Sequence, residues 1–582
     1  MVFYPPERAP KLQSPPDDVA ICDFMLDERY GRYPLGYSKD PFTCGLTGKT
    51  YSALDMADRV DYLARAMSKE FGWHPNQGTE WDKVVGIFSV NTIDFITLAW
   101  ATHRLSGIAS PANAAYSAPE LAYQLTNSGS KVLFTCATLL PTALEAADKA
   151  GIPKSKVYLL DLPEPAMNGS KAPAEFKTVS QFIQEGKSLP RIEKLNWSPG
   201  QGARQTAFLC YSSGTSGLPK GVMISHRNVI SNTLQFGLTE AKYREGLKEP
   251  GIQSGYNDVI LGLLPQSHIY SLVVVCHAGP YRGDQVIILP KYEMNQYLDT
   301  IERFKISTLA LVPPIIIGML RNQEACNKRD LSSVKCLVTG AAPLGAETAA
   351  DLQKQYPKWL IRQAYGLTET CTVVCSTYPD DIWLGSSGSL LPGFEARILD
   401  PEGKGLTGYD QAGELVVRSP SVVLGYLKNE KATKETFEDG WMRTGDEAVI
   451  RLGPNGTEHI FIVDRIKELI KVKGMQVAPA ELESHLLSHP NVADCAVIQI
   501  PDESAGELPK AYVVKSASAS KDDAATARSI QKHVEDHKAR HKWLKGGVEF
   551  IDVIPKSPSG KILRRLLRDK DRESRRKAGA KL

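Results

Sequence analysis

Short apolar runs alternate with longer amphipathic stretches over roughly the first two thirds of the chain. Residues 83–90, 131–136 and 156–162 are predicted as buried strands, and residues 92–105 and 139–151 as helices between them. The runs "VIILP", "TLALVP" and "KCLVTG" repeat this pattern after residue 285. Continuous Val, Ile and Leu runs joined by helices are typical of parallel sheets that are covered on both faces. We therefore expect an α/β fold.

The pattern changes after about residue 385. "FEARILD", "GELVVRS" and "HIFIVDR" alternate apolar and polar positions between Gly, Pro and Asp turns, which predicts an antiparallel or barrel-like portion. The last hundred residues return to α+β, with helices over 478–489 and 524–538 and strands over 492–500 and 511–516. We place a domain boundary near Asp464, giving domains 1–463 and 464–582. Residues 163–204, rich in Pro, Ser and Lys, are predicted to form a surface excursion.

Composition and charge agree with a soluble enzyme. The 582 residues are 42 % hydrophobic and 23 % charged. The net charge is +3, but residues 561–582 hold ten Lys and Arg against three Asp and Glu, so they carry +7 and the remainder −4. This tail is interpreted as a solvated helix, since no aromatic residue is interleaved for stacking on nucleic acid. The fourteen apolar residues 307–320 are too short to span a membrane.

The spacing of the cysteines and the sequences at the two ends of the chain predict the cellular compartment. The ten cysteines show no paired zinc-site spacing and are expected to be buried free thiols, which fits a reducing compartment. The N-terminus lacks the apolar segment of a signal peptide. The last residues, Ala580-Lys581-Leu582, resemble the peroxisomal signal Ser-Lys-Leu. We therefore expect recognition by the peroxisomal import receptor, with neither nucleic acid nor a membrane span involved.

A loop rich in glycine and hydroxyl side chains follows the apolar run "TAFLCY". Its backbone amides and hydroxyls suit phosphate oxygens, and Lys220 adds a positive charge. The residues of this predicted phosphate loop are Ser212, Ser213, Gly214, Thr215, Ser216, Gly217 and Lys220. Leu218 and Pro219 separate the last of these glycines from the lysine, so the loop does not match the common Gly-Lys-Ser/Thr nucleotide motif.

Six motifs, in order, closely resemble those of the adenylate-forming superfamily, which includes acyl-CoA synthetases. They are "YSSGTSGLPKGVMISH", "TGAAPLG", "QAYGLTET", "GWMRTGD", "FIVDRIKELIKVKGMQVAPAELE" and "PKSPSGKILRR", and they cover residues 212–565. Within the superfamily, the sequence is most similar to 4-coumarate–CoA ligases and their peroxisomal relatives. The resemblance implies a large N-terminal domain of two α/β sheets plus a small β-barrel, and a smaller mobile α+β C-terminal domain.

The resemblance also implies a two-step ligase that uses ATP, Mg²⁺ and coenzyme A. A carboxylate attacks the α-phosphate of ATP, and a thiol then displaces AMP from the acyl-adenylate. Such catalysis relies mainly on positioning and electrostatic stabilisation. By resemblance, the loop holds the β- and γ-phosphates, Thr368 contacts the α-phosphate, and Glu369 binds Mg²⁺. Asp446 and Arg465 hold the ribose hydroxyls, and the adenine pocket is lined by Gln363 and by the backbone near Ala341 and Tyr365. Ala364 stands where the plant ligases usually have glycine, and the exact contacts with adenine stay open.

The resemblance assigns the C-terminal domain two sets of contacts. Lys561 corresponds to the lysine that stabilises the adenylation transition state. Lys467, Lys471 and Gln476 are expected on the adenylate side, and Lys291, Lys473 and Gly474 on the coenzyme A side. Asp464 matches the hinge about which the C-terminal domain rotates between the half-reactions.

Residues 263–275, "LLPQSHIYSLVVV", occupy the position of the acyl pocket. His268 is expected at the substrate carboxylate, although a histidine satisfied within the core remains an alternative. Tyr270, Val274 and Ala341 are expected to line the pocket, and no Asp or Glu in this segment would pair with an ammonium group. Val274 replaces a small polar residue of the plant ligases, which favours an aryl-alkanoic or medium-chain acid over a hydroxycinnamate.

Three other functions remain open at this stage. The acceptor of the acyl group could be a carrier-protein thiol, although no carrier domain follows Lys561. The adenylate could be oxidised, as in luciferases, or the chain could be a catalytically inactive nucleotide-binding module. A hydrolase is disfavoured, because neither a Gly-x-Ser-x-Gly elbow nor a His-Glu-x-x-His helix occurs.

Overall fold

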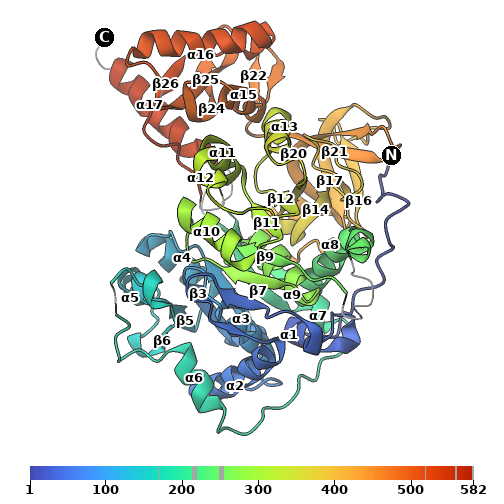
Figure 1. Ribbon diagram of the computed structural model, residues 1–582, viewed down its shortest axis with the longest axis vertical. Coiled ribbons are helices and arrows are strands. Elements are labelled where there is room, and N and C mark those ends of the chain that lie inside the picture. Colours follow the sequence, from blue (N-terminus) through green and yellow to red (C-terminus); the bar gives the residue numbers. More distant parts are fainter. Residues whose placement is uncertain (170, 213–218, 248–254, 518, 558–559, 580–582) are drawn as a thin grey trace.

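A computed structural model describes residues 1–582 except 170, 213–218, 248–254, 518, 558–559 and 580–582. It contains two large sheets of mainly parallel strands, a smaller antiparallel sheet and a separate C-terminal sheet (Figure 1). The predicted α/β fold, with a large N-terminal domain of sheets and a smaller C-terminal domain, is therefore confirmed.

The first sheet has seven strands in the order β18-β8-β7-β4-β3-β5-β6. Its strands are β3 (Val84–Phe88), β4 (Ile108–Ala112), β5 (Val132–Thr135), β6 (Val157–Leu159), β7 (Thr206–Ser212), β8 (Lys220–Ser225) and β18 (Gly425–Tyr426). The three strands predicted here correspond to β3, β5 and β6, which pair in parallel. Because β7 and β8 pair antiparallel, the two ends of the predicted phosphate loop lie side by side.

The second sheet has nine strands in the order β15-β14-β13-β12-β11-β9-β10-β1-β2. Its strands are β1 (Phe42–Cys44), β2 (Thr50–Tyr51), β9 (Val259–Gly262), β10 (Gln285–Ile288), β11 (Thr308–Leu311), β12 (Cys336–Thr339), β13 (Leu360–Leu367), β14 (Thr372–Ser376) and β15 (Ser389–Leu390). The run from β10 through β9, β11 and β12 to β13 is parallel, as the apolar runs after residue 285 predict.

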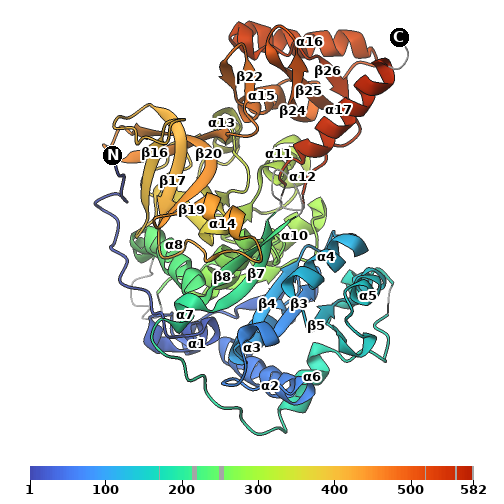
Figure 2. The same cartoon turned by 180° about the vertical axis from the view of Figure 1, so that it is seen from behind.

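Helices cover and separate these sheets (Figure 2). They are α1 (Ile21–Leu26), α2 (Ala53–Phe71), α3 (Phe95–Arg104), α4 (Ala118–Ser128), α5 (Leu140–Lys149), α6 (Val179–Gly186), α7 (Gln201–Arg204), α8 (His226–Gly246), α9 (Gly279–Tyr281), α10 (Met294–Phe304), α11 (Pro313–Arg321), α12 (Gln323–Asn327), α13 (Ala346–Gln355) and α14 (Glu430–Thr436). The π-helix η7 (Tyr270–Ala278) belongs to this set. Trp100 Nε1 of α3 donates to His277 Nε2 of η7 at 3.0 Å, which joins the two layers in the core.

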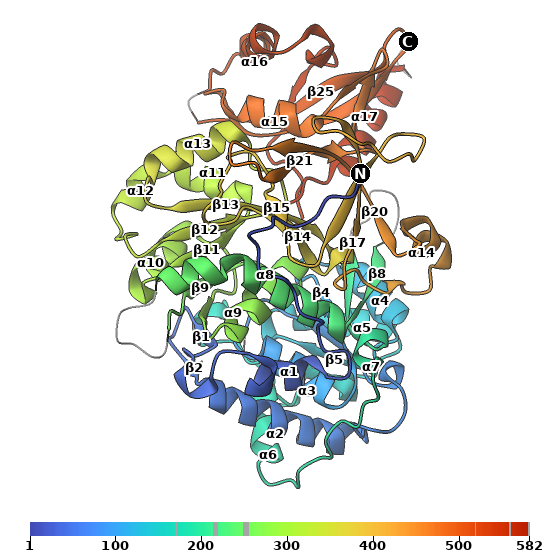
Figure 3. The same ribbon diagram turned by 90° about the vertical axis from the view of Figure 1, so that its right-hand side faces the viewer.

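The third sheet contains β16 (Glu395–Leu399), β17 (Ala412–Arg418), β19 (Phe437–Glu438), β20 (Trp441–Leu452) and β21 (Glu458–Arg465). All its pairings are antiparallel, as the alternating pattern after residue 385 predicts. Figure 3 shows the N-terminal arm running along the outside of the molecule from this sheet to α1, and the arm is anchored where Phe3 pairs with Ala396.

The C-terminal sheet contains β22 (Ile470–Val472), β23 (Met475–Val477), β24 (Val492–Asp502), β25 (Gly506–Lys515) and β26 (Val548–Phe550). Helices α15 (Pro479–Leu487), α16 (Asp523–His537) and α17 (Arg564–Gly579) pack around it. Its buried apolar residues form clusters of their own, apart from the large N-terminal core. The boundary at Asp464 itself stays a prediction.

Residues 163–204 are not simply a surface excursion, and that prediction is wrong for the middle of the segment. Helix α6 buries Val179, Phe182 and Ile183 in the core, and Gly186 packs against α2 so closely that a Cβ there would lie 1.8 Å from the Tyr62 carbonyl oxygen. The segment was judged by its overall composition, which the flanking prolines, serines and lysines dominate. The helical periodicity of the eight residues of α6 was therefore overlooked.

The cysteines and the apolar segment 307–320 were two further points of the sequence analysis. All ten cysteines are buried and unpaired. The apolar segment 307–320 divides into β11 and α11 at the Pro313-Pro314 pair. Among the described residues, none of the helices combines the length and apolar character needed to cross a bilayer.

Candidate active site

The predicted phosphate loop connects the ends of β7 and β8. Ser212 and Lys220 are paired across the antiparallel ladder, so the start and end of the loop are fixed together. Ser213, Gly214, Thr215, Ser216 and Gly217 lie outside the described residues. The Lys220 ammonium lies over the ring of Tyr426, 4.6 Å from its centroid, in a cation–π contact.

Glu369 is buried beside Ser212. Its Oε1 accepts hydrogen bonds from the hydroxyl of Ser212 at 3.2 Å and the hydroxyl of Tyr426 at 2.9 Å. Glu369 lies on a 3-10 turn, Thr368–Thr370, between β13 and β14. Tyr426 was missed by sequence reasoning, because it lies outside the six motifs and its role depends on the pairing of β18 with β8.

Gly366 allows the turn to form. A Cβ at this position would lie 1.4 Å from the carbonyl oxygen of Thr372, so any larger residue would push β13 away from β14. The Thr370 hydroxyl accepts a hydrogen bond from the Leu367 amide at 3.0 Å and so closes the turn. The sequence "YGLTET" therefore fixes the direction in which Glu369 points.

Asp446 is the second buried carboxylate of the site. Its Oδ2 accepts a hydrogen bond from the Tyr365 hydroxyl at 2.6 Å, and its Oδ1 lies 3.7 Å from Nε of Arg465. The pairing of β20 with β21 places Asp446 directly opposite Arg465. Burial raises the pKa of Asp446 above its ordinary value, and Arg465 and Tyr365 partly oppose this effect.

Lys561 reaches this cluster from the C-terminal domain. Burial and the charge of Arg465 lower the pKa of Lys561 to about 8, while Asp446 and Glu369 act in the opposite direction. Gly560, at φ +82°, packs against Val312 and Pro314 of the N-terminal domain, where a Cβ would have atoms of both residues at 3.4 Å. The ammonium group of Lys561 in the C-terminal domain therefore interacts electrostatically with the carboxylates of Asp446 and Glu369 in the N-terminal domain.

His268 lies next to the same lysine. Burial, together with the positive charge of Lys561, lowers the pKa of His268 to about 4. Its Nδ1 accepts the Tyr270 amide at 3.3 Å, so the imidazole is a neutral group with one nitrogen occupied. Among the described residues, none forms a hydrogen bond with Nε2 of His268, so the alternative of a histidine that is fully satisfied inside the core gains no support.

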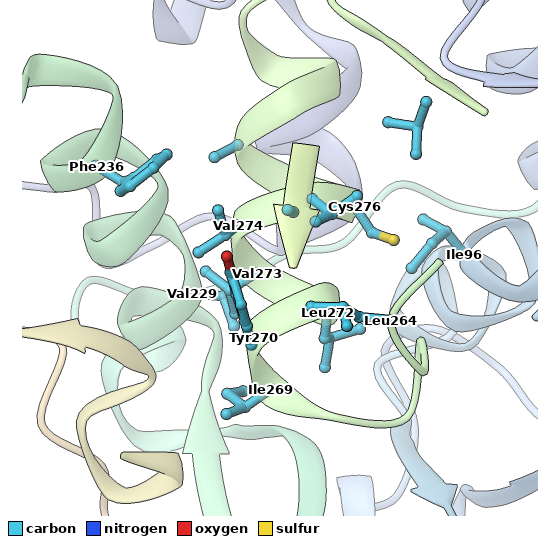
Figure 4. Close-up of a cluster of buried hydrophobic side chains, with 14 of the residues drawn as sticks. Ile96, Val229, Phe236, Leu264, Ile269, Tyr270, Leu272, Val273, Val274 and Cys276 are labelled. Atoms are coloured by element: carbon cyan, nitrogen blue, oxygen red, sulfur yellow. The ribbon is translucent and has the colours of Figure 1, made fainter. Parts of the chain in front are cut away.

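Tyr270 and Val274, which are predicted to line the acyl pocket, lie on the π-helix η7, and π-helices are frequently found at functional sites. Figure 4 shows Tyr270 and Val274 between η7 and α8, beside Val229 and Phe236. These side chains are all buried. The Tyr270 hydroxyl donates to the Val338 carbonyl at 2.8 Å, so the polar end of this side chain is satisfied and its ring adds apolar surface.

The predicted adenine pocket lies at the ends of β12 and β13. Ala341 adopts φ +67°, an uncommon conformation for alanine, and a Cβ on Gly340 would lie 3.1 Å from the Ala364 carbonyl. Gln363 Oε1 accepts the Leu344 amide at 3.3 Å. The side chain of Gln363 therefore supports the loop after β12, and its contact with adenine stays a prediction.

The remaining predicted residues are not brought to this cluster. Lys471 and Gln476 are exposed and paired across the β22–β23 hairpin, which turns at Lys473 and Gly474. Lys467 lines a cavity of about 500 Å³ within the C-terminal domain, beside Glu468 and Arg568. Lys291 is exposed after β10. Among the described residues, no hydrogen bond or ion pair joins any of these side chains to Glu369, Asp446 or Lys561.

Asp464 lies where the third sheet passes into the C-terminal domain. It is buried, its Oδ1 accepts the Arg465 amide at 2.7 Å, and its Oδ2 accepts the Ala480 amide at 2.9 Å in the first turn of α15. A carboxylate at a helix N-terminus is favourably placed. Asp464 thus links both sides of the predicted hinge, although its role as a hinge stays a prediction.

Comparison with known proteins identifies the family. The model of the AMP-binding enzymes matches residues 34–427, and that of their C-terminal domain matches residues 481–561. The acyl-CoA ligase easD of Emericella nidulans is 42 % identical over 98 % of this chain and 100 % of its own length. The acyl-CoA ligase cm3C of Cordyceps militaris is 40 % identical over 98 % and 90 %, respectively. The chain therefore belongs to the AMP-binding enzyme family.

Solved structures agree with this assignment. The anthranilate CoA ligase AuaEII, in complex with anthranoyl-AMP, superimposes with a TM-score of 0.79 at 23 % identity, covering 95 % of this chain and 98 % of that one. ATP-bound MatB from Rhodopseudomonas palustris gives a TM-score of 0.75 at 26 % identity, with coverages of 95 % and 99 %. The prediction of an acyl-CoA ligase is confirmed. The closer likeness to 4-coumarate–CoA ligases stays a prediction.

Proposed function

We propose that the protein joins an aryl-alkanoic or medium-chain acid to coenzyme A in two steps. First, a carboxylate oxygen bonds to the α-phosphorus of ATP, and the bond between that phosphorus and pyrophosphate breaks. Second, the thiol of coenzyme A loses its proton and bonds to the acyl carbon, and the bond between that carbon and AMP breaks. Within the family, we assign the protein to the group that resembles 4-coumarate–CoA ligases.

The convergence of Lys561 with Glu369 and Asp446 carries this proposal. Lys561 is separated from both carboxylates along the chain and lies in another domain, yet its pKa responds to both of them. In-line displacement at phosphorus concentrates negative charge between the acid and the phosphate, and a buried ammonium group stabilises that charge. Lys561 is accordingly the residue that completes the adenylation site.

The other residues position ATP. Asp446, oriented by Tyr365 and Arg465, accepts hydrogen bonds from the ribose hydroxyls. Thr368 precedes Glu369 on the same turn and contacts the α-phosphate. The phosphate loop, from Ser212 to Lys220, binds the phosphates that leave as pyrophosphate.

Glu369 suits a magnesium ion. Hard cations of this kind bind carboxylate oxygens, and the two hydrogen bonds described above both fall on Oε1 of Glu369. Among the described residues, none donates a hydrogen bond to Oε2 of Glu369. When bound there, Mg²⁺ would neutralise charge on the phosphates.

The apolar lining supports an uncharged acyl tail. Tyr270 and Val274 are buried between η7 and α8, and His268 is a neutral imidazole at neutral pH, since burial holds its pKa near 4. A neutral imidazole with a free Nε2 can hydrogen-bond to the carboxylate without carrying a charge. Binding of an apolar acid then follows from burial of its carbon surface.

Coenzyme A is the proposed acceptor, and it would enter after rotation about Asp464. In the adenylation state that we propose, Lys561 acts beside Glu369 and Asp446, and the Lys473–Gly474 turn stays exposed. Rotation would withdraw Lys561 and present the turn instead, with Lys291 as a further contact. Lys467, Lys471 and Gln476 would move with the C-terminal domain.

The test is a pyrophosphate-release screen over a panel of carboxylic acids, with and without coenzyme A. Release is expected to depend on an aryl-alkanoic or medium-chain acid and to require Lys561, so that Lys561→Ala loses at least two orders of magnitude. Lys545→Ala changes an exposed lysine of the same domain and is the matched control. Full activity of Lys561→Ala would overturn the assignment.

The same assay separates the alternatives. An acyl-CoA product supports the proposal, whereas acylation of a phosphopantetheinyl carrier protein in its place would identify a carrier-loading enzyme. Nucleotide binding without release of pyrophosphate for any acid would identify an inactive module.

We also propose import into peroxisomes through Ala580, Lys581 and Leu582, which lie outside the described residues. The test compares the location of the intact chain with that of a chain lacking these three residues. Peroxisomal location of the shortened chain would contradict the proposal, and its activity in vitro should be unchanged.

A further inference from the structure

Four of the eleven histidines gather on one side of the C-terminal domain, outside the proposed active site. His485 lies on α15, His489 two residues beyond its end, and His533 and His537 on α16. Helix α16 covers the outer face of this domain, next to α15 (Figure 1). None of the proposed catalytic roles uses these residues.

The sequence itself creates this cluster. His533 and His537 are four residues apart, so they project from the same face of α16, one turn apart. The packing of α15 against α16 then adds His485, whose ring stacks on that of His533 with centroids 4.2 Å apart. The rings of His485 and His537, and of His533 and His537, lie 5.2 and 5.1 Å apart.

Backbone carbonyls determine which ring nitrogens remain free. His485 Nε2 lies 3.2 Å and His537 Nδ1 2.9 Å from the carbonyl oxygen of His533, and His533 Nε2 lies 3.3 Å from that of His485. A carbonyl can only accept, so each of these nitrogens carries the proton. The opposite nitrogen of each ring, Nδ1 of His485 and His533 and Nε2 of His537, therefore presents a lone pair.

Metal-binding histidines usually show this arrangement, in which one ring nitrogen donates to a carbonyl and the other binds the ion. We propose that His485, His533 and His537 bind one divalent transition-metal cation of the Zn²⁺ class, which clips α15 to α16. A ligand nitrogen of each residue lies within 4.8 Å of those of the other two. Tetrahedral coordination at about 2.1 Å places ligand nitrogens about 3.4 Å apart, so binding requires the parallel rings of His485 and His533 to leave their stacked arrangement and turn their planes toward the ion.

The ligand chemistry selects the class of metal. Three imidazoles without a carboxylate suit Zn²⁺, Ni²⁺ or Cu²⁺ and disfavour Mg²⁺ and Ca²⁺, which prefer oxygen ligands. A water molecule completes the coordination, because both ring nitrogens of His489 are already hydrogen-bonded, Nδ1 to the Asn491 amide at 3.1 Å and Nε2 to the Ser529 hydroxyl at 3.2 Å. The ion would add a cross-link to the hydrogen bonds and ring stacking that already join α15 to α16.

The experiment titrates the full chain, prepared without a polyhistidine tag and stripped with a chelator, with ZnCl₂ in the presence of excess Mg²⁺. Calorimetry should give one Zn²⁺ per chain, and the unfolding midpoint should rise with zinc. His537→Gln and the double variant His533→Gln/His537→Gln should bind at least about tenfold more weakly. His541→Gln, a nearby histidine outside the cluster, should bind like the parent.

A second readout identifies the ligands. Co²⁺ added to the stripped chain should produce the intense visible absorption of a tetrahedral site, and the double variant should lose it. Equal zinc affinity in the parent and in the double variant would overturn the proposal, as would the absence of stoichiometric binding in the parent. Because His537 is exposed at the end of α16, its replacement should leave the unfolding midpoint of the metal-free chain unchanged.

Discussion

Lys561 shows how strongly burial controls a single charge. Below about pH 8 its side chain is a protonated ammonium group, and above that pH the charge is lost, because burial and Arg465 lower its pKa from 10.5 to about 8. We therefore expect kcat/KM for adenylation to fall as the pH rises through 8. The measurement is acid-dependent release of pyrophosphate as a function of pH.

The control for this prediction is Lys561→Arg. A guanidinium group stays protonated throughout this range, so the variant should be slower but should lack the decline above pH 8. The same decline in both proteins would assign it to another group. His268 should contribute no change near neutrality, since its pKa is about 4.

Tyr426 offers a second test at the scale of one residue. Tyr426→Phe removes the 2.9 Å hydrogen bond to Glu369 but keeps the ring under Lys220. A hydrogen bond to a charged group contributes about 1.5–3 kcal/mol, so we expect the Mg²⁺ concentration for half-maximal adenylation to rise by about tenfold. Titration with Mg²⁺ measures this effect.

Tyr409→Phe is the matched control, because Tyr409 makes a similar 3.0 Å bond to Glu458 on the exposed part of the third sheet. It should leave the Mg²⁺ dependence unchanged. An unchanged dependence in Tyr426→Phe would mean that the hydrogen bond does not orient Glu369.

Residues inside the motifs were predictable because each motif joins a residue type to its local turn. Glu369 and Asp446 are examples, because both are buried and both act on the pKa of Lys561. Tyr426 could not be predicted, since its contact depends on a strand two residues long that pairs with a distant hairpin. The roles assigned to Lys473 and Gly474 depend on rotation of the C-terminal domain, so they stay predictions.

At the scale of elements, the apolar runs predicted the parallel strands well, because a strand buried on both faces needs continuous apolar residues. Strand β4 was not predicted, since Ser110 and Pro111 interrupt its apolar pattern. Helix α6 was hidden by its flanking composition. Its packing depends on Gly186, whose importance is visible only when α2 is placed beside it.

Gly186→Ala should therefore lower the thermal unfolding midpoint without changing the turnover of the folded enzyme. The new Cβ would overlap the Tyr62 carbonyl at 1.8 Å, so α6 must move away from α2. Overpacking of this kind costs about 1–3 kcal/mol. Calorimetry or circular dichroism on heating measures the midpoint.

Gly237→Ala is the control, because it lies in α8 with no atom within 4 Å of the added Cβ. Alanine is favoured over glycine inside a helix by about 0.5–1 kcal/mol, so this variant should be neutral or more stable. Equal midpoints for the two variants would show that α6 adjusts freely to the added methyl group.

For the whole molecule, the decisive question is how the C-terminal domain is held over the site. Arg321, at the end of α11, donates to the carbonyl oxygens of Val492 (at 2.7 Å) and Ala493 in the C-terminal domain. The preceding residues Val312 and Pro314 pack against Gly560, the neighbour of Lys561. Helix α11 and the segment leading into it therefore help to seat the catalytic lysine.

If domain rotation separates the two half-reactions, these contacts exist only in the adenylation state. Arg321→Ala should then slow adenylation about fivefold, the equivalent of about 1 kcal/mol, and should leave the transfer of the acyl group to coenzyme A unchanged or faster. Pyrophosphate exchange measures the first half-reaction, and conversion of isolated acyl-adenylate by coenzyme A measures the second.

Arg329→Ala provides the comparison, since Arg329 contacts Asp299, Asn295 and Ala325 within the N-terminal domain. It should affect neither half-reaction selectively. An equal loss of both half-reactions in Arg321→Ala would mean that the contact stabilises the enzyme generally. A selective loss of adenylation would instead show that a single arginine biases the equilibrium between two domain arrangements, because only interactions that differ between the two states can shift their populations.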